Sequence, residues 1–90
     1  MPDLRKPKPV TDFQMEMIDG EAVILHPSST KVLYTNPSGA LVWDLCDGAR
    51  TVDGIIAAIR ETFPEAAEQI PGDVLEALEG FIAAGVMLWV

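Results

Sequence analysis

The 90-residue chain is poor in the residues from which catalytic and metal sites are built. Cys46 is its single cysteine and His26 its single histidine, which excludes a disulfide within these residues and a zinc site of several cysteines. No apolar run approaches the roughly 18 residues that a membrane span needs. The basic residues at the start have no apolar segment behind them, so they do not form a secretory signal. We therefore expect a cytoplasmic protein without a metal, a cofactor or a membrane partner.

The two single residues that could perform chemistry have unsuitable neighbours. Asp44 and Asp47 flank Cys46, and nearby carboxylates raise the pKa of a thiol, whereas a nucleophile needs it lowered. His26 stands beside Pro27 at the end of an expected strand, without a partner nearby in the sequence. We interpret Cys46 as a buried structural thiol and His26 as a surface residue, and we predict that the chain is not an enzyme.

Positive charge is also scarce, and it is unevenly placed. The net charge is −8, and Arg5, Lys6 and Lys8 are three of the six basic residues. Residues 51–90 hold seven acidic residues against one base, Arg60. Because such a surface repels phosphate backbones, we expect no nucleic-acid partner.

Composition divides the chain into a short arm and one domain. Residues 1–11 contain three of the seven prolines and three cations with little apolar content, which predicts a flexible or extended arm. Residues 12–90 are long enough for one small hydrophobic core and too short for two. We therefore predict a single domain over residues 12–90.

Three short segments before residue 36 have the character of β-strands. Phe13–Ile18 alternates apolar and polar residues, and Asp19–Gly20 behind it is a strong signal for a tight hairpin turn. The apolar segment Glu21–His26 follows, and Lys31–Thr35 has the β-branched and aromatic content of a third strand. The order predicts a three-stranded antiparallel sheet.

Helical periodicity begins after this sheet. Asn36, Thr51 and Asp73 are the expected N-caps, because each precedes apolar residues at three- and four-residue spacing. Three strands followed by three helices predict an α+β, winged-helix-like fold. The apolar end, residues 86–90, fits either a short strand or an exposed surface, so both a monomer and a dimer remain open. The expected helices span about residues 37–46, 52–63 and 73–84.

The strand Lys31–Thr35 is the best candidate for a binding surface. A three-stranded sheet leaves two edges, and an uncovered edge offers unpaired N–H and C=O groups to a guest strand. If the third helix lies beside this edge, Val74, Leu78, Phe81 and Ile82 could receive alternate side chains of the guest. The alternative is that these four residues face only the core of the domain.

Five motifs follow one another along residues 13–88: Val23–Pro27, Leu33–Trp43, Asp47–Val52 with Ile55, Asp73–Val74 and Gly85–Val86. In this order and spacing they resemble the PqqD-like family. The resemblance implies a non-catalytic recognition element that binds the leader segment of a ribosomally made precursor peptide. Such an element presents the peptide to a modifying enzyme, which in pyrroloquinoline quinone biosynthesis is a radical S-adenosylmethionine protein.

The resemblance also implies where a leader would bind. It would pair with Lys31–Thr35 as an added strand and contact the third helix around Asp73, Ala77, Leu78 and Phe81. The acidic residues of this helix favour a leader with basic or uncharged residues near its anchor. The predicted peptide-binding residues are Lys31, Val32, Leu33, Tyr34, Thr35, Asp73, Val74, Ala77, Leu78 and Phe81.

Two functions of other classes compete with this prediction. One is a winged-helix regulator that dimerises through its apolar end and binds DNA weakly, although the third helix lacks the cations that such binding requires. The other is a structural or regulatory protein-interaction subunit of a neighbouring enzyme, without a peptide ligand.

Overall fold

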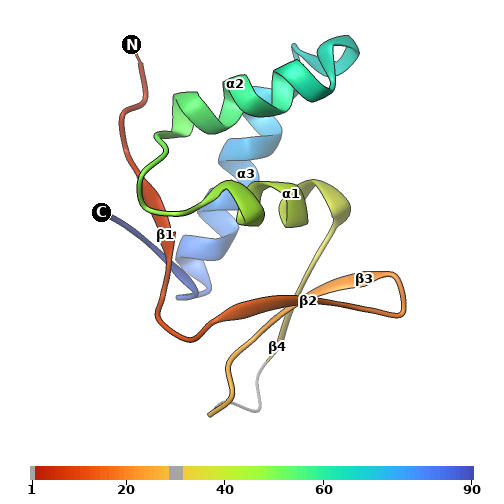
Figure 1. Ribbon diagram of the computed structural model, residues 1–90, viewed down its shortest axis with the longest axis vertical. Coiled ribbons are helices and arrows are strands. Elements are labelled where there is room, and N and C mark those ends of the chain that lie inside the picture. The colour runs from red at the N-terminus through yellow and green to blue at the C-terminus, as the bar shows by residue number, and fades with distance from the viewer. Residues whose placement is uncertain (1, 29–31) are drawn as a thin grey trace.

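The computed structural model describes residues 2–28 and 32–90. It confirms the expected α+β fold, with three helices gathered at one end of the molecule and a three-stranded antiparallel sheet at the other (Figure 1). A second, two-stranded sheet joins the two ends of the chain. The elements are β1 Pro7–Pro9, β2 Gln14–Ile18, β3 Glu21–Leu25, β4 Val32–Thr35, α1 Pro37–Leu45, α2 Val52–Thr62, the 3-10 helix η1 Pro64–Ala66, α3 Ile70–Ala83 and β5 Met87–Trp89.

The three-stranded sheet has the order β2-β3-β4, so β4 lies at an edge. Asp19 and Gly20 between β2 and β3 have φ values of 51° and 82°, the left-handed conformation that a two-residue hairpin turn requires. Tyr34 lies opposite Val23 in the register of β3 with β4, and Leu33 lies opposite Ile24. The expected hairpin and the expected edge strand are both confirmed.

Side-chain caps start the first two helices where the sequence indicates. The Asn36 side chain accepts a hydrogen bond from the Gly39 N–H at 2.7 Å, and the Thr51 side chain accepts one from the Gly54 N–H at 3.1 Å. Each bond satisfies an amide that would otherwise lack a partner in the first turn. Because α1 follows β4 after one residue, its first turn is held against the end of the edge strand.

The third helix begins earlier than expected. It starts at Ile70 rather than behind Asp73, because Pro71 fits the first turn, where its missing N–H costs no hydrogen bond. Asp73 lies inside that first turn, where a carboxylate interacts favourably with the helix dipole. Gly85, with a φ of 79°, ends the helix as expected.

The core lies where the helices meet one another and β3. The Trp43 and Phe81 rings pack edge-to-face, with centroids 5.3 Å apart, a geometry that aromatic pairs prefer. Trp43 is buried, as its place among apolar helix positions predicts. The other large and almost fully inaccessible side chains of the core include Ile24, Ile55, Leu78, Val42, Val52 and Val74.

The start of the chain differs from the expected free arm. Strand β1 pairs with β5, and Pro7 is fully buried. The Val90 N–H donates to the Lys6 carbonyl at 2.8 Å, whereas the Pro7 carbonyl accepts from the Gly48 N–H on the other side of the strand. The missing N–H groups of Pro7 and Pro9 therefore point away from β5, so the ladder loses no donor.

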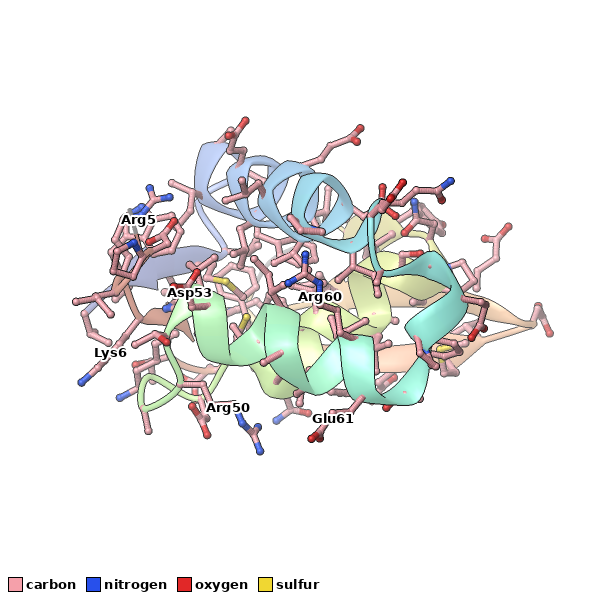
Figure 2. All side chains as sticks on the ribbon, turned by 90° about the horizontal axis from the view of Figure 1, so that it is seen from above. Arg5, Lys6, Arg50, Asp53, Arg60 and Glu61 are labelled. Carbon is pink, nitrogen blue, oxygen red and sulfur yellow. The ribbon has the colours of Figure 1, made fainter. Side chains whose placement is uncertain are left out.

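The same pairing decides the form of the apolar C-terminal residues, which form the strand β5. The Arg5 guanidinium lies 4.3 Å from the centre of the Trp89 ring, a cation–π contact that covers part of this aromatic side chain. Figure 2 shows Arg5 and Lys6 at one end of the molecule, together with Arg50. None of the helices within residues 2–28 and 32–90 has the length and apolar character to cross a membrane.

Candidate functional site

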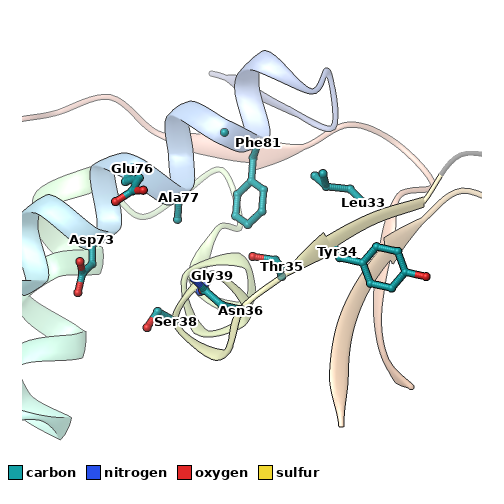
Figure 3. Close-up of a pocket in the computed structure, with 11 residues that line it drawn as sticks. Leu33, Tyr34, Thr35, Asn36, Ser38, Gly39, Asp73, Glu76, Ala77 and Phe81 are labelled. Carbon is teal, nitrogen blue, oxygen red and sulfur yellow. The ribbon is translucent and has the colours of Figure 1, made fainter. Parts of the chain in front are cut away.

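A cleft of about 300 Å³ runs between the edge strand β4 and the helix α3. The first turn of α1 closes one end of it (Figure 3). Strand β4 and the adjoining start of α1 thus form one concave surface with α3, which is distant in the sequence. The lining residues are Leu33, Tyr34, Thr35, Asn36, Ser38, Gly39, Asp73, Glu76, Ala77, Gly80 and Phe81.

Strand β4 supplies one wall and a backbone edge. Leu33 and Thr35 are half-buried, whereas Val32 and Tyr34 are 47% and 63% exposed, which is the alternation of a strand with two different faces. Within the described residues, β4 pairs with β3 alone. Alternate N–H and C=O groups on its other side are therefore free to pair with a further strand.

Helix α3 supplies the opposite wall. Phe81 points from the helix toward β4 in Figure 3. Its ring packs edge-to-face with Trp43 and is 3% exposed, so a small part of it reaches the cleft. Ala77 lies one turn earlier on the same face. A Cβ at Gly80 would have no heavy atom within 4 Å, so the absence of a side chain at this position leaves the cleft open.

The closed end of the cleft depends on a close approach between α1 and β4. A Cβ added at Gly39 would collide with Oγ1 of Thr35. Glycine therefore lets the first turn of α1 pack against the last residue of the strand. The Asn36 side chain fixes this turn through its hydrogen bond with the Gly39 N–H.

The electrostatic character of the cleft is acidic. Among the described residues, Asp73 and Glu76 are the charged ones that line it, and none of the lining residues is basic. Both project from the half of α3 that lies beside the start of α1 in Figure 3. The apolar side chains of Phe81 and Leu33 lie farther along the cleft, so its two ends differ in chemistry.

The structure brings together six of the ten residues that the sequence nominates. Val32 belongs to β4 but does not line the cleft, and Lys31 lies outside the described residues. Val74 and Leu78 do not line the cleft, and their side chains, which are 1% and 0% exposed, pack in the core. The six that line the cleft are Leu33, Tyr34, Thr35, Asp73, Ala77 and Phe81.

Helical geometry explains why the side chains of Val74 and Leu78 face the core and why other residues of α3 line the cleft. Positions 74, 78 and 81 recur at the i, i+4, i+7 spacing of a buried face. Glu76 and Gly80, which the sequence analysis missed, share the cleft face with Ala77. Their spacing from Asp73 places them on the same face of a helix, and this pattern in the sequence could have identified both. No local pattern indicated that Asn36, Ser38 and Gly39 would close the cleft.

Cys46 and His26 lie outside the cleft and offer no nucleophile to it. Cys46 is buried, and its thiol donates to the Val42 carbonyl at 3.1 Å. Burial, with a smaller effect of the Asp47 charge, raises the pKa of this thiol to about 12. The His26 ring accepts a hydrogen bond from the Ser28 N–H at 3.0 Å. No group of three or more potential ligands suited to a metal ion occurs among the described residues.

Comparisons with known proteins agree on one family. Residues 21–87 match the family model for coenzyme PQQ synthesis protein D (PqqD). A protein of Azotobacter vinelandii named PqqA binding protein is 42% identical over 67 residues, covering 74% of this chain and 70% of the relative. A Pseudomonas aeruginosa protein of the same name is 37% identical over 81 residues, covering 87% of this chain and 78% of the relative.

One solved structure shares the fold. It is described as TbiB1 in complex with the TbiA(beta) leader peptide, and it superposes with a TM-score of 0.70. The superposition covers 89% of this chain and 93% of that chain. Since the two sequences are 19% identical, the match shows a common fold.

Proposed function

Because this chain belongs to the family of coenzyme PQQ synthesis protein D (PqqD), we infer that it is a non-catalytic adaptor that binds the leader segment of a ribosomally made precursor peptide. The observation that carries this proposal is the unpaired edge of β4 beside the cleft against α3. Two findings support it: the relatives are named PqqA binding protein, and the solved structure with the same fold contains a leader peptide.

We propose strand addition as the mode of binding. The leader pairs its backbone with the free edge of β4, and main-chain hydrogen bonds supply sequence-independent affinity. Every second side chain of the guest then points into the cleft, where Phe81 and Ala77 provide apolar contacts. The order of side chains along the guest strand thereby sets the specificity.

Charge narrows the class of leader. Asp73 and Glu76 occupy the end of the cleft nearest α1, where a guest carboxylate would be repelled and a guest lysine or arginine attracted. We therefore propose that the bound segment carries a basic or uncharged side chain at this end and an apolar one near Phe81.

In this proposal the adaptor also binds a second protein, the enzyme that modifies the precursor. A modifying enzyme, in particular a radical S-adenosylmethionine enzyme, receives the precursor that the adaptor holds. Holding both partners raises the effective concentration of the precursor at the enzyme. Because the precursor is made on ribosomes, we place this encounter in the cytoplasm.

Two glycines of α3 provide a sharp test. A Cβ meets nothing within 4 Å at either Gly80 or Gly72, but only Gly80 lines the cleft. Gly80→Leu fills the cleft, while leucine also favours the helix over glycine by up to ~1 kcal/mol. Gly72→Leu makes the same change on the same helix outside the cleft. We expect both variants to fold and only Gly80→Leu to lose leader binding.

Heteronuclear NMR titration with synthetic leaders of precursors encoded near the gene provides the measurement. Binding should shift amide signals of β4 and of the cleft face of α3. Equal affinity of Gly80→Leu and Gly72→Leu for a bound leader would place the ligand elsewhere. A folded wild-type protein that binds none of the leaders would favour a protein-interaction subunit, and salt-sensitive binding of duplex DNA would favour the regulator.

A further inference from the structure

A second cavity adjoins the cleft. It encloses about 350 Å³ between α1, α2, η1 and α3. Its walls are mostly apolar, and no basic residue lines it within the described part of the chain. The apolar residues that line it include Leu41, Ile59, Phe63, Ala66, Ile70 and Val74.

The cavity and the cleft share two lining residues. Ser38 in the first turn of α1 and Asp73 in the first turn of α3 line both of them. Strand β4 ends at Thr35, one residue before α1 begins. A peptide that leaves the β4 edge at this end therefore meets the surface formed by Ser38 and Asp73, and the second cavity lies on the other side of these two residues.

Phe63 makes the cavity attractive to an apolar group. It is the C-cap of α2, and the Pro64 of η1 follows it, so the chain turns here and leaves the aromatic side chain 42% exposed beside the cavity. Leu41 and Ile70 form the facing walls from α1 and α3. A guest side chain inserted here would remove apolar surface of both molecules from water.

We propose that the leader that pairs with β4 also inserts an apolar side chain, from outside its strand-forming segment, into this second cavity. The proposal rests on the proposed function, since the same peptide occupies both places. Because Ser38 and Asp73 line both places, a peptide bound in the cleft lies directly beside the second cavity, which favours the leader over a separate ligand as its occupant. The concave shape suits an inserted side chain rather than a flat protein face, and buried anchors of this kind carry most of the binding energy in interfaces.

Paired substitutions in the protein and in the peptide test the second site. A synthetic leader that binds the wild-type chain is scanned with alanine by fluorescence anisotropy against the wild type, Phe63→Ala and Leu88→Ala. Leu88 is the matched control, because it is also 42% exposed but lines neither the cleft nor the cavity. Hydrogen exchange of the bound leader identifies the segment that pairs as a strand.

The expected result is one apolar leader residue, outside the protected segment, whose replacement weakens binding to the wild type about tenfold, as for an anchor buried in a pocket. The same replacement should change binding to Phe63→Ala less than twofold, because the pocket is already lost. Leu88→Ala should respond like the wild type. Ala66→Gln, which narrows the cavity from η1 with a polar side chain, should repeat the effect of Phe63→Ala.

Two outcomes would overturn the second site while leaving the adaptor intact. In one, alanine at each leader position changes the binding affinity by the same factor for the wild type and for Phe63→Ala. In the other, both Phe63→Ala and Ala66→Gln bind the whole leader as tightly as Leu88→Ala does. A failure of the adaptor itself looks different, because then the wild type binds no leader or Gly80→Leu binds it normally.

Discussion

Gly39 and Thr35 control the closed end of the cleft at the scale of single residues. Glycine is unfavourable inside helices, yet here it lets α1 approach the end of β4 so closely that a Cβ would meet Oγ1 of Thr35. The Thr35 Cβ lies 3.2 Å from the same point, so a change of rotamer alone does not remove the crowding. The helix thus sacrifices some intrinsic stability for the position of its first turn.

Replacing Gly39 by alanine should therefore destabilise the protein. Alanine gains about 1 kcal/mol of helix propensity, but overpacking at a tight contact costs about 1–3 kcal/mol, so we expect a net loss measured by urea unfolding. In a Thr35→Ala background, which removes Oγ1, the loss should shrink. An equal loss in both backgrounds would show that the crowding with Oγ1 is not its cause.

Cys46 is a structural thiol whose chemistry is suppressed by its position. Its folded pKa is raised by burial from 9.0 to about 12, so the unfolded chain releases the thiol proton first as the pH rises. The stabilising contribution of the neutral thiol is complete below about pH 9 and is lost between about pH 9 and 12.

Thiol alkylation and alkaline unfolding can test this description of Cys46. At pH 8 iodoacetamide should react slowly with the native protein and rapidly in denaturant, because the reactive species is the thiolate. The free energy of unfolding should fall more steeply between pH 8.5 and 10.5 in the wild type than in Cys46→Ala. Fast alkylation of the native protein would contradict the burial of this side chain.

At the scale of elements, β1 is part of the folded domain, although its composition indicates a free arm. The segment before β2 bonds with β5 on one side and with the turn between α1 and α2 on the other. The Arg5 carbonyl, for example, accepts from the Val52 N–H at 2.9 Å. Residues 3–9 therefore connect β5 with the start of α2, and β5 follows the helix that forms the cleft wall.

Deletion of residues 2–9 should lower the free energy of unfolding by on the order of 2–4 kcal/mol, because it removes the buried Pro7 and leaves several backbone groups unpaired. Thermal unfolding followed by circular dichroism measures this effect. Lys8→Ala is the control, because its exposed side chain should contribute less than about 0.5 kcal/mol. Unchanged stability after the deletion would support the free arm that the composition predicts.

Charge is distributed unevenly over the whole molecule. The chain carries a net charge of −8, while Arg5, Lys6 and Arg50 gather at the end that holds β1 (Figure 2). The part of the cleft formed by residues 2–28 and 32–90, by contrast, has two carboxylates and no base. The field of the molecule thus favours the approach of a cationic peptide.

The association rate of a basic leader should fall as salt is raised, since the screening length shrinks to about 10 Å at 0.1 M ionic strength. Glu76→Gln and Glu79→Gln change the net charge equally, but only Glu76 lines the cleft. Stopped-flow measurements should show similar small decreases in association rate for both. The peptide should dissociate faster only from Glu76→Gln. An unchanged dissociation rate for this variant would show that Glu76 does not contact the bound peptide.

Local interactions explain why much of the fold could be predicted from the sequence. The caps at Asn36 and Thr51, the hairpin turn at Asp19–Gly20 and the helix end at Gly85 each depend on residues within a few positions of one another. The start of α3 was misplaced because Asp73 resembles a cap in isolation, while Pro71 permits the earlier start at Ile70.

The sequence by itself determined the order of the elements, the scarcity of catalytic groups and the acidic character of α3, because periodicity, caps and charge are local properties. Only the tertiary structure decided that residues 7–9 pair with residues 87–89 and that Val74 and Leu78 face the core. It also decided that Gly39 and Gly80 shape the cleft from two different helices. These features depend on which distant surfaces bury one another, and no local pattern of residues specifies that choice.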